Sequence, residues 1–280
     1  MKLYNTAGGI FLVDNEQTWL VNTDWDSLIN RDGLEEHLKA SLNNFVKVSA
    51  EVLQKAQILA PINSQEIWAA GVTWLRSRDA RMEESETAAS LYDLVYNAER
   101  PELFFKATKQ RVAAHLQEVY IRKDSTWDVP EPELTLFISS AGNIQGYTIG
   151  NDMSSRSIEG ENALYLPQAK IYERCAGLGP CLYVTSTPLS AETTISMNIK
   201  RAGEVLYNDS VQIARIKRSF TELAGFLFRE CDFPSGCFLM TGTCLVPSND
   251  FTLQPGDVVE MSIEGIGTLI NTVAYHPKHG

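Results

Sequence analysis

Short apolar runs broken by polar turns make up the first 60 residues of the chain. The segment from Gly9 to Val21 holds two apolar runs around Asp14-Asn15, which is the pattern of a β-hairpin. Two short helices are expected after it, over Arg31–Leu42 and Lys47–Ala56, before Pro61 interrupts the chain. We therefore expect a small N-terminal α/β domain over residues 1–60 and one larger domain over residues 61–280.

The larger domain alternates apolar runs with turn residues, as a strand-rich protein does. An apolar strand is expected over Ile67–Ala70, and the longest helical pattern runs from Trp74 to Arg100 without Gly or Pro. A second helix is expected over Phe220–Phe228. Further strands are expected at Leu103–Phe105, Val119–Ile121, Leu134–Ile138, Tyr147–Ile149, Cys181–Val184, Thr194–Ile199, Val205–Tyr207, Val258–Ile263 and Thr268–Val273. Because most strands follow one another along the chain, the pattern predicts an α+β protein rather than a doubly wound parallel sheet.

Composition narrows the class of function. The 280 residues are 44% hydrophobic and 21% charged, as in an ordinary globular protein. The 24 basic and 35 acidic residues give a net charge of −11, which disfavours binding to nucleic-acid backbones. No apolar stretch approaches the ~20 residues of a membrane span. The five cysteines, an odd number without a Cys-x-x-Cys spacing, predict reduced thiols. We expect a cytoplasmic protein that does not bind membranes.

Two acidic residues at the start of a predicted strand suggest a metal site. Glu131 and Glu133 are two positions apart, so an extended chain points both carboxylates to the same face. Pro130 and Pro132 stiffen this arrangement. A divalent cation relieves the repulsion between two such carboxylates, and magnesium binds carboxylates together with water and substrate oxygens. Two solvated strand residues are the alternative interpretation.

A third acid and a lysine extend this set of candidates. Asp152 follows the apolar strand Tyr147–Ile149 and is either the cap of a following helical turn or a third carboxylate ligand. Lys170 lies 18 residues further along the chain. The alternative for Lys170 is a surface pair with Glu161 or Glu173. Both alternatives stay open from these residues alone.

Taken in order, these motifs resemble those of the fumarylacetoacetate hydrolase superfamily. The resemblance covers roughly residues 67–273 and rests on Glu131-x-Glu133, Gly146-Tyr-Thr-Ile-Gly-Asn-Asp152-x-Ser-x-Arg156, Lys170, Leu178-Gly-Pro180, Met240-Thr-Gly-Thr243 and Ile263–Asn271. It implies a mixed β-roll with a small N-terminal unit, assembled as a homodimer or homotetramer. It also implies that Glu131, Glu133 and Asp152 bind magnesium, manganese or calcium, which chelates a small 2-oxo acid.

Positions that differ between branches of this family point to a dehydratase. Family hydrolases that cleave carbon–carbon bonds usually carry a His in a helical segment that follows a Gly-x-x-Tyr motif, which Gly71-Val-Thr-Trp74 matches here. This chain has Ser77 in place of that His, flanked by Arg76 and Arg78, and an arginine does not act as a base at neutral pH. The segments Arg100–Thr108, Glu161–Tyr172 and Gly242–Pro247 resemble the 2-keto-3-deoxy-sugar-acid dehydratases instead.

The resemblance to this branch implies a reaction and a set of site residues. A 2-keto-3-deoxypentonate, such as 2-keto-3-deoxy-arabinonate or -xylonate, would lose water through a metal-bound enolate and give 2,5-dioxopentanoate. Lys170 and Glu102 are the candidates for acid and base, with neither role assigned. Substrate contacts are expected from Thr243, Gly242, Arg156 and Trp74, and Arg156 is also expected to hold the metal carboxylates.

Two further expectations concern an alternative enzyme activity and the role of one histidine. A family hydrolase or decarboxylase that acts on an acylpyruvate-like 2-oxo acid is the alternative enzyme. His115 is the histidine nearest to the motifs, and we expect it to be structural.

Overall fold

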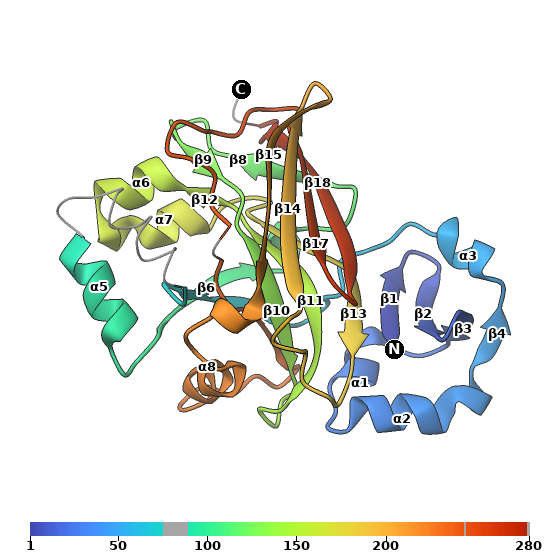
Figure 1. Cartoon of the computed structure of the whole chain (residues 1–280). Coiled ribbons are helices and arrows are strands. Elements are labelled where there is room, and N and C mark those ends of the chain that lie inside the picture. Colours follow the sequence, from blue (N-terminus) through green and yellow to red (C-terminus); the bar gives the residue numbers. More distant parts are fainter. Residues whose placement is uncertain (75–88, 244, 279–280) are drawn as a thin grey trace.

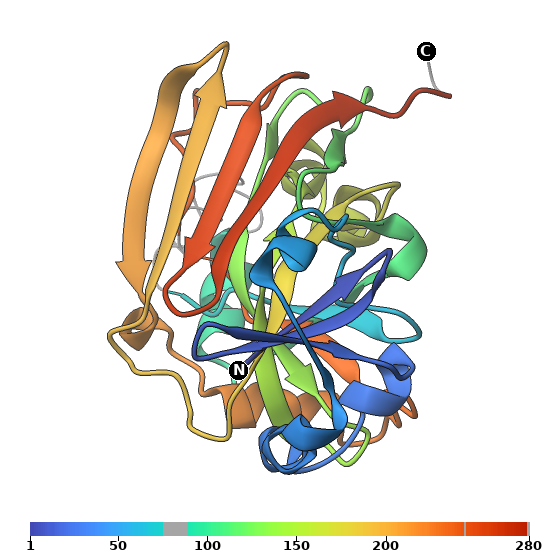
Figure 2. The same ribbon diagram turned by 90° about the vertical axis from the view of Figure 1, so that its right-hand side faces the viewer.

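The computed structural model describes residues 1–74, 89–243 and 245–278, and strands dominate it. Two sheets pack together, and helices lie at their ends and sides (Figures 1 and 2). A small third sheet joins β9 (Asp128–Val129) to β12 (Ser154–Ser155). The predicted α+β class is therefore confirmed.

The larger sheet has 11 strands and is mostly antiparallel. Its order begins with β4 (Val46–Val48), β3 (Gln17–Val21), β2 (Gly9–Asp14), β1 (Lys2–Thr6), β13 (Ala176–Val184) and β11 (Ile144–Asp152). It continues with β10 (Pro132–Ile138), β16 (Cys237–Met240), β5 (Glu66–Gly71) and β6 (Glu102–Thr108), while β7 (Val112–Ala113) pairs with β13. Only the pairs β16–β5 and β13–β7 are parallel among the described pairs of this sheet.

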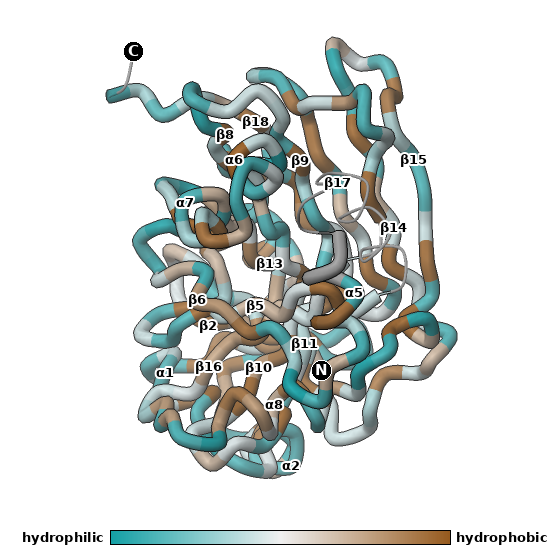
Figure 3. Tube along the Cα trace, turned by 90° about the vertical axis from the view of Figure 1, so that its left-hand side faces the viewer, coloured by the Kyte–Doolittle hydropathy of each residue, from teal (hydrophilic) through white to brown (hydrophobic). Residues whose placement is uncertain are grey.

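The second sheet supplies the other wall of the main hydrophobic core. Its order is β15 (Glu204–Gln212), β14 (Thr194–Arg201), β17 (Val258–Ile263), β18 (Gly267–Tyr275) and β8 (Glu118–Ile121). Buried and partly exposed residues alternate along β14 and β17, because one face of each strand packs on β10 and β11. Hydrophobic residues accordingly recur along β14 and β17 in Figure 3.

The N-terminal residues extend the larger sheet and cover its other face. β1 pairs with β13, with Lys2 opposite Tyr183. A second core, which contains Leu12, Leu28, Leu38 and Phe137, lies beneath helices α1 (Trp25–Ile29) and α2 (Leu34–Ser41). Strands from both sides of residue 60 belong to this one sheet. The domain boundary placed at residue 60 therefore stays a prediction.

Several local predictions are confirmed in the structure. β2 and β3 form the expected hairpin, and β14 and β15 form a second one around Ala202-Gly203. The helix predicted over Lys47–Ala56 is shorter, since Val46–Val48 pairs with β3 as a strand. Helix α3 (Ala50–Gln54) begins only after Ser49, whose hydroxyl accepts a hydrogen bond from the Glu51 N–H.

The remaining helices lie around the ends of the strands. They are α5 (Ala89–Asn97), α6 (Arg156–Glu161), α7 (Leu166–Lys170) and α8 (Phe220–Leu227), with 3₁₀ turns at Leu42–Asn44, Lys109–Arg111, Ala163–Tyr165 and Ile213–Arg215. The helix predicted over Trp74–Arg100 falls partly outside the described residues, and α5 lies within its described part. Trp74 itself forms a bridge with Ile216. Across the described ranges, no helix is both long and apolar enough to cross a membrane.

Candidate active site

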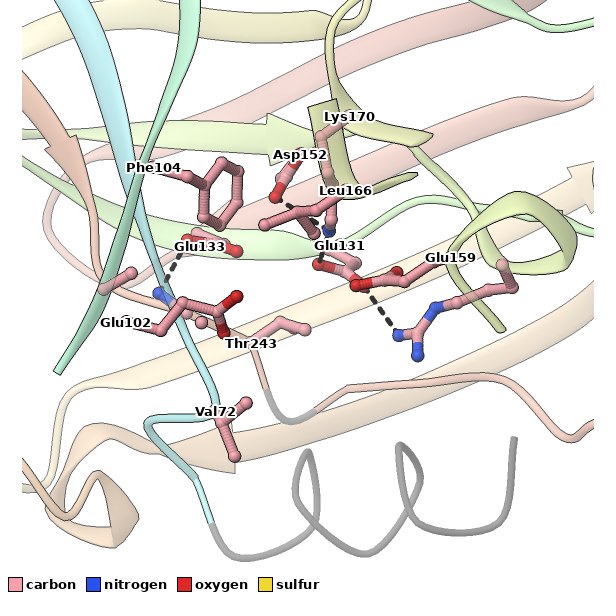
Figure 4. A pocket seen from close by; sticks show the side chains of 14 residues that line it. Val72, Glu102, Phe104, Glu131, Glu133, Asp152, Glu159, Leu166, Lys170 and Thr243 are labelled. Atoms are coloured by element: carbon pink, nitrogen blue, oxygen red, sulfur yellow. Dashed lines mark hydrogen bonds and ion pairs between the residues drawn. The ribbon is translucent and has the colours of Figure 1, made fainter. Parts of the chain in front are cut away.

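Most of the predicted site residues meet in one cavity (Figure 4), which lies at the ends of strands of the larger sheet and beside α6 and α7. The strands β10, β11 and β6 bring acidic side chains to it, and the two helices bring basic ones. Eight of the nine predicted residues line the cavity: Glu102, Glu131, Glu133, Asp152, Arg156, Lys170, Gly242 and Thr243.

Three carboxylates form the centre of the cavity. Glu131 and Glu133 flank Pro132 at the start of β10 and face the same side, as their spacing predicts. Asp152 ends the neighbouring strand β11, and its N–H donates to the Glu131 carbonyl at 2.9 Å. One oxygen from each side chain lies within 4.8 Å of the other two, and all three residues are at most 3% exposed. Asp152 is therefore not a helix cap, since Ser155 caps α6 instead.

This oxygen set fits a hard divalent cation. Magnesium and calcium bind carboxylate oxygens, and these three side chains converge from two adjacent strands. Burial, together with the charges of Asp152 and Glu131, raises the pKa of Glu133 well above its ordinary value. Three carboxylates shielded from water repel one another, and a bound dication would compensate their charge. The geometry of these oxygens thus suits a divalent metal ion.

Two buried cations hold the outer side of these carboxylates. The Lys170 Nζ lies 2.9 Å from Glu131 Oε2, 3.0 Å from Asp152 Oδ2 and 2.5 Å from Ser154 Oγ. The Arg156 guanidinium donates to Glu131 Oε1 at 2.6 Å (Figure 4). Lys170 is 1% exposed, so the alternative of a surface pair with Glu161 or Glu173 is wrong.

A tight loop after β16 holds Glu133. The Gly242 N–H donates to Glu133 Oε2 at 2.6 Å, with a φ of 92° that favours glycine. A Cβ at Gly242 would lie 2.0 Å from Thr73 Oγ1, so a side chain has no room there. Trp74 lies behind this loop, where its indole N–H donates to the Gly242 carbonyl at 3.0 Å. A direct contact of Trp74 with substrate stays a prediction.

Glu102 occupies a slot at the edge of the cavity. It begins β6, and Gly71 on β5 lies opposite it in the sheet. A Cβ at Gly71 would lie 2.0 Å from Glu102 Oε2, so the glycine leaves room for this carboxylate. Glu102 is partly buried, and Phe104 lines the cavity beside it. The ring of Phe105 packs on Trp68.

Two further charged residues belong to this region and were not predicted from the sequence. Glu159 on α6 is 3% exposed and lines the cavity. Lys106 on β6 is fully buried, and its Nζ lies 2.5 Å from Asp152 Oδ1. The spacing of Lys106 could have indicated its place in the site. Glu102, Phe104 and Lys106 are two positions apart from one another, so they share one face of a strand.

Other candidates lie elsewhere. The His115 Nδ1 accepts a hydrogen bond from the Ile270 N–H, and burial lowers its pKa, as expected for a structural histidine. The four cysteines within the described ranges are free thiols, in agreement with the prediction. Arg76, Ser77, Arg78 and Cys244 lie outside the described residues.

Sequence comparisons match the chain to one family and to two dehydratases. The profile described as fumarylacetoacetate (FAA) hydrolase C-terminal matches residues 81–274. A probable 2-keto-3-deoxyxylonate dehydratase from Haloferax volcanii is 47% identical over 240 residues, covering 85% of this chain and 82% of the relative. A 2-dehydro-3-deoxy-D-arabinonate dehydratase from Saccharolobus solfataricus is 40% identical over 227 residues, covering 79% and 76%.

Solved structures extend the similarity over the full length. A 2-keto-3-deoxy-D-arabinonate dehydratase complexed with magnesium and 2,5-dioxopentanoate superposes with a TM-score of 0.84 and 32% identity, covering 99% of each chain. A 5-carboxymethyl-2-hydroxymuconate delta-isomerase from Mycobacterium smegmatis has a TM-score of 0.67 at 20% identity, covering 99% of each chain. The second likeness concerns the fold alone, because this architecture carries several chemistries.

Proposed function

The chain belongs to the fumarylacetoacetate hydrolase family, and from this premise we propose that it is a magnesium-dependent dehydratase of a 2-keto-3-deoxy sugar acid. It removes water from a 2-keto-3-deoxypentonate, such as the arabinonate or xylonate, and produces 2,5-dioxopentanoate. The cluster of three buried carboxylates carries this proposal, since it offers a site for the magnesium that the similar dehydratase structure contains.

Glu131, Glu133 and Asp152 would hold the magnesium ion. When bound, magnesium supplies a Lewis acid that polarises the keto group of a 2-oxo acid and acidifies the protons on C3. The Gly242 N–H holds one oxygen of Glu133 and leaves the other oxygen of that carboxylate for the metal, while Arg156 and Lys170 each hold one oxygen of Glu131 and fix its orientation.

Lys170 and Glu102 carry the two proton transfers in this proposal. One of them removes a proton from C3, and the other protonates the C4 hydroxyl as it leaves. They reach the cavity from different elements, Lys170 from α7 and Glu102 from β6 (Figure 4). Elimination leaves a double bond between C3 and C4. Loss of a proton from C5 and gain of one at C3 move this double bond to C4 and C5, and tautomerisation of the resulting enol yields the aldehyde at C5.

Deuterium exchange assigns these two roles. In D₂O, a variant that lacks the acid still exchanges the C3 protons of the substrate but does not dehydrate it. A variant that lacks the base does neither. Lys170→Met and Glu102→Gln, followed by proton NMR, therefore identify which side chain is the base. If both variants dehydrate at the wild-type rate, neither residue is catalytic.

The remaining site residues would bind the substrate. Gly242 and Thr243 line the cavity at the end of β16, where the Thr243 hydroxyl and the backbone suit a carboxylate or hydroxyl group. Arg156 lines the same cavity, and Trp74 supports the Gly242 loop. A homodimeric or homotetrameric assembly and a cytoplasmic location complete the proposal, and light scattering of the purified protein tests the assembly.

A product assay tests the activity. Purified protein with magnesium is incubated with 2-keto-3-deoxy acids of five and six carbons and with an acylpyruvate, and products are identified by mass spectrometry. We expect 2,5-dioxopentanoate from a five-carbon substrate and none after addition of a chelator. Release of pyruvate or of a carboxylic acid from the acylpyruvate, without any dioxo product, would overturn the dehydratase in favour of a hydrolase.

A further inference from the structure

Lys106 is a fully buried lysine beneath the carboxylate cluster. It lies on β6, two positions beyond Phe104 and four beyond Glu102, so strand alternation turns all three side chains to one face. Glu102 and Phe104 line the cavity, whereas Lys106 reaches past it to the residues behind the cavity wall. A charged group is almost never fully buried unless specific partners compensate it, so the contacts of Lys106 indicate its role.

Three acceptors surround the Lys106 ammonium. Its Nζ lies 2.5 Å from Asp152 Oδ1, and it donates to the Met153 carbonyl at 2.9 Å and to the Lys170 carbonyl at 2.5 Å. An ammonium has three N–H donors and no acceptor; the two carbonyls accept hydrogen bonds from it, and the Asp152 carboxylate compensates its charge as an ion pair. The ring of Tyr172 lies 5.9 Å away and adds a favourable cation–π contact.

These contacts connect Lys106 to two residues of the proposed site. Asp152 has one oxygen at Lys106 and the other at the Lys170 Nζ, so its carboxylate plane is fixed between two ammonium groups. Lys170 is the last residue of α7, and its carbonyl is held by Lys106 while its side chain extends into the cavity. One side chain on β6 thus fixes the end of β11 and the end of α7 together.

We propose that Lys106 is a positioning residue of the metal centre. It orients Asp152 toward the cation and sets the point from which Lys170 reaches the cavity, without touching metal or substrate. The turnover part of this inference rests on the proposed dehydratase function, whereas the metal-binding part does not.

Substitution of Lys106 separates this role from general support of the fold. Lys106→Met keeps the length and volume but removes the charge and the donors. Lys106→Arg keeps the charge but presents a planar fork in place of a compact ammonium. Arg201→Met is the matched control, because Arg201 compensates the buried carboxylate of Asp257 at 2.7 Å on the second sheet.

The experiment measures Mn²⁺ affinity by electron paramagnetic resonance and the metal-free unfolding temperature of each variant. Loss of a group that orients a metal ligand typically weakens metal affinity by about 10–100-fold. We expect that loss in Lys106→Met, a smaller loss in Lys106→Arg, and wild-type affinity in Arg201→Met despite its lower unfolding temperature. At saturating metal we also expect a lower kcat in Lys106→Met, because Lys170 has lost its anchor.

Wild-type Mn²⁺ affinity in folded Lys106→Met would overturn the proposal. If Lys106→Met does not fold, wild-type affinity and kcat in Lys106→Arg would overturn it instead. The two proposals fail separately. A wild-type protein that binds Mn²⁺ but dehydrates no 2-keto-3-deoxy acid contradicts the function alone, while active variants with unchanged affinity contradict only the role of Lys106.

Discussion

Substitution of Gly71 by alanine tests the position of Glu102 without changing that residue. A Cβ at Gly71 would lie 2.0 Å from Glu102 Oε2 and 2.7 Å from its Cδ. Gly71 ends strand β5 in a conformation open to alanine, and the obstructed group is the far end of a flexible side chain. We therefore expect Gly71→Ala to fold normally and to displace the Glu102 carboxylate.

The size of the displacement gives the expected effect on rate. Ordinary contact begins near 3.4 Å, so the oxygen must move by about 1.4 Å from its position against Gly71. A shift of about 1 Å in a catalytic group lowers the rate by roughly 100-fold, or about 2.7 kcal/mol in the activation barrier. We expect a loss of that order in kcat, with magnesium affinity unchanged.

A double-mutant cycle shows whether the loss passes through Glu102. We measure kcat at saturating magnesium for Gly71→Ala, for Glu102→Gln and for the double variant. If the alanine acts only by moving Glu102, the double variant is no slower than Glu102→Gln alone. Gly225→Ala is the control, because a Cβ at this exposed position of helix α8 meets nothing within 4 Å.

Two results would refute this reasoning. Wild-type kcat in Gly71→Ala would mean that the carboxylate position does not matter to the reaction. Losses that multiply in the double variant would mean that Gly71 acts on something other than Glu102.

Three further predictions concern stability and metal binding. Burial raises the pKa of Asp128 from 3.8 to about 6, so folding favours its protonated form and the resulting stability is lost as pH rises from about 4 to 6. The free energy of unfolding of Asp128→Asn should therefore rise relative to that of the wild type by up to about 3 kcal/mol between pH 4 and pH 7.5. Urea unfolding at both pH values measures this difference. Glu133→Gln should weaken magnesium binding at least 100-fold in calorimetry and raise the metal-free unfolding temperature at pH 8, because it removes a buried charge; unchanged affinity would contradict the ligand role. Gly242→Ala should lower the free energy of unfolding by about 3 kcal/mol, because it places a Cβ against Thr73 at a positive φ; an unchanged unfolding temperature would contradict that geometry.

Local sequence patterns made much of the fold predictable. The two hairpins depend on turn residues at Asp14-Asn15 and Ala202-Gly203, and α8 depends on a run of helix-compatible apolar positions after its Ser219 cap. The pairing of β1 with β13 joins residues about 180 positions apart, and no periodicity within either segment specifies that partner. The short strand β4 was missed for a related reason, since Val46 and Val48 gain their strand structure from pairing with β3.

The candidate site was predictable where spacing fixes direction. Glu131 and Glu133 share a face because strand side chains alternate, and the family motif added Asp152 and Lys170. Lys106 was not identified, because a lysine in a strand normally points to solvent and its buried partners come from β11 and α7. Those partners are 46 to 64 residues away in sequence, so only the folded structure brings them to the lysine.

Anomalous diffraction from crystals grown with Mn²⁺ tests the metal centre most directly. The predicted result is one anomalous peak in this cavity, about 2.0–2.4 Å from one carboxylate oxygen each of Glu131, Glu133 and Asp152. The same crystals soaked with a 2-keto-3-deoxypentonate should show its 2-oxo acid group at the remaining positions of that ion. A Mn²⁺ peak elsewhere, or none in this cavity at millimolar metal, would contradict a metal-dependent dehydration at these three carboxylates.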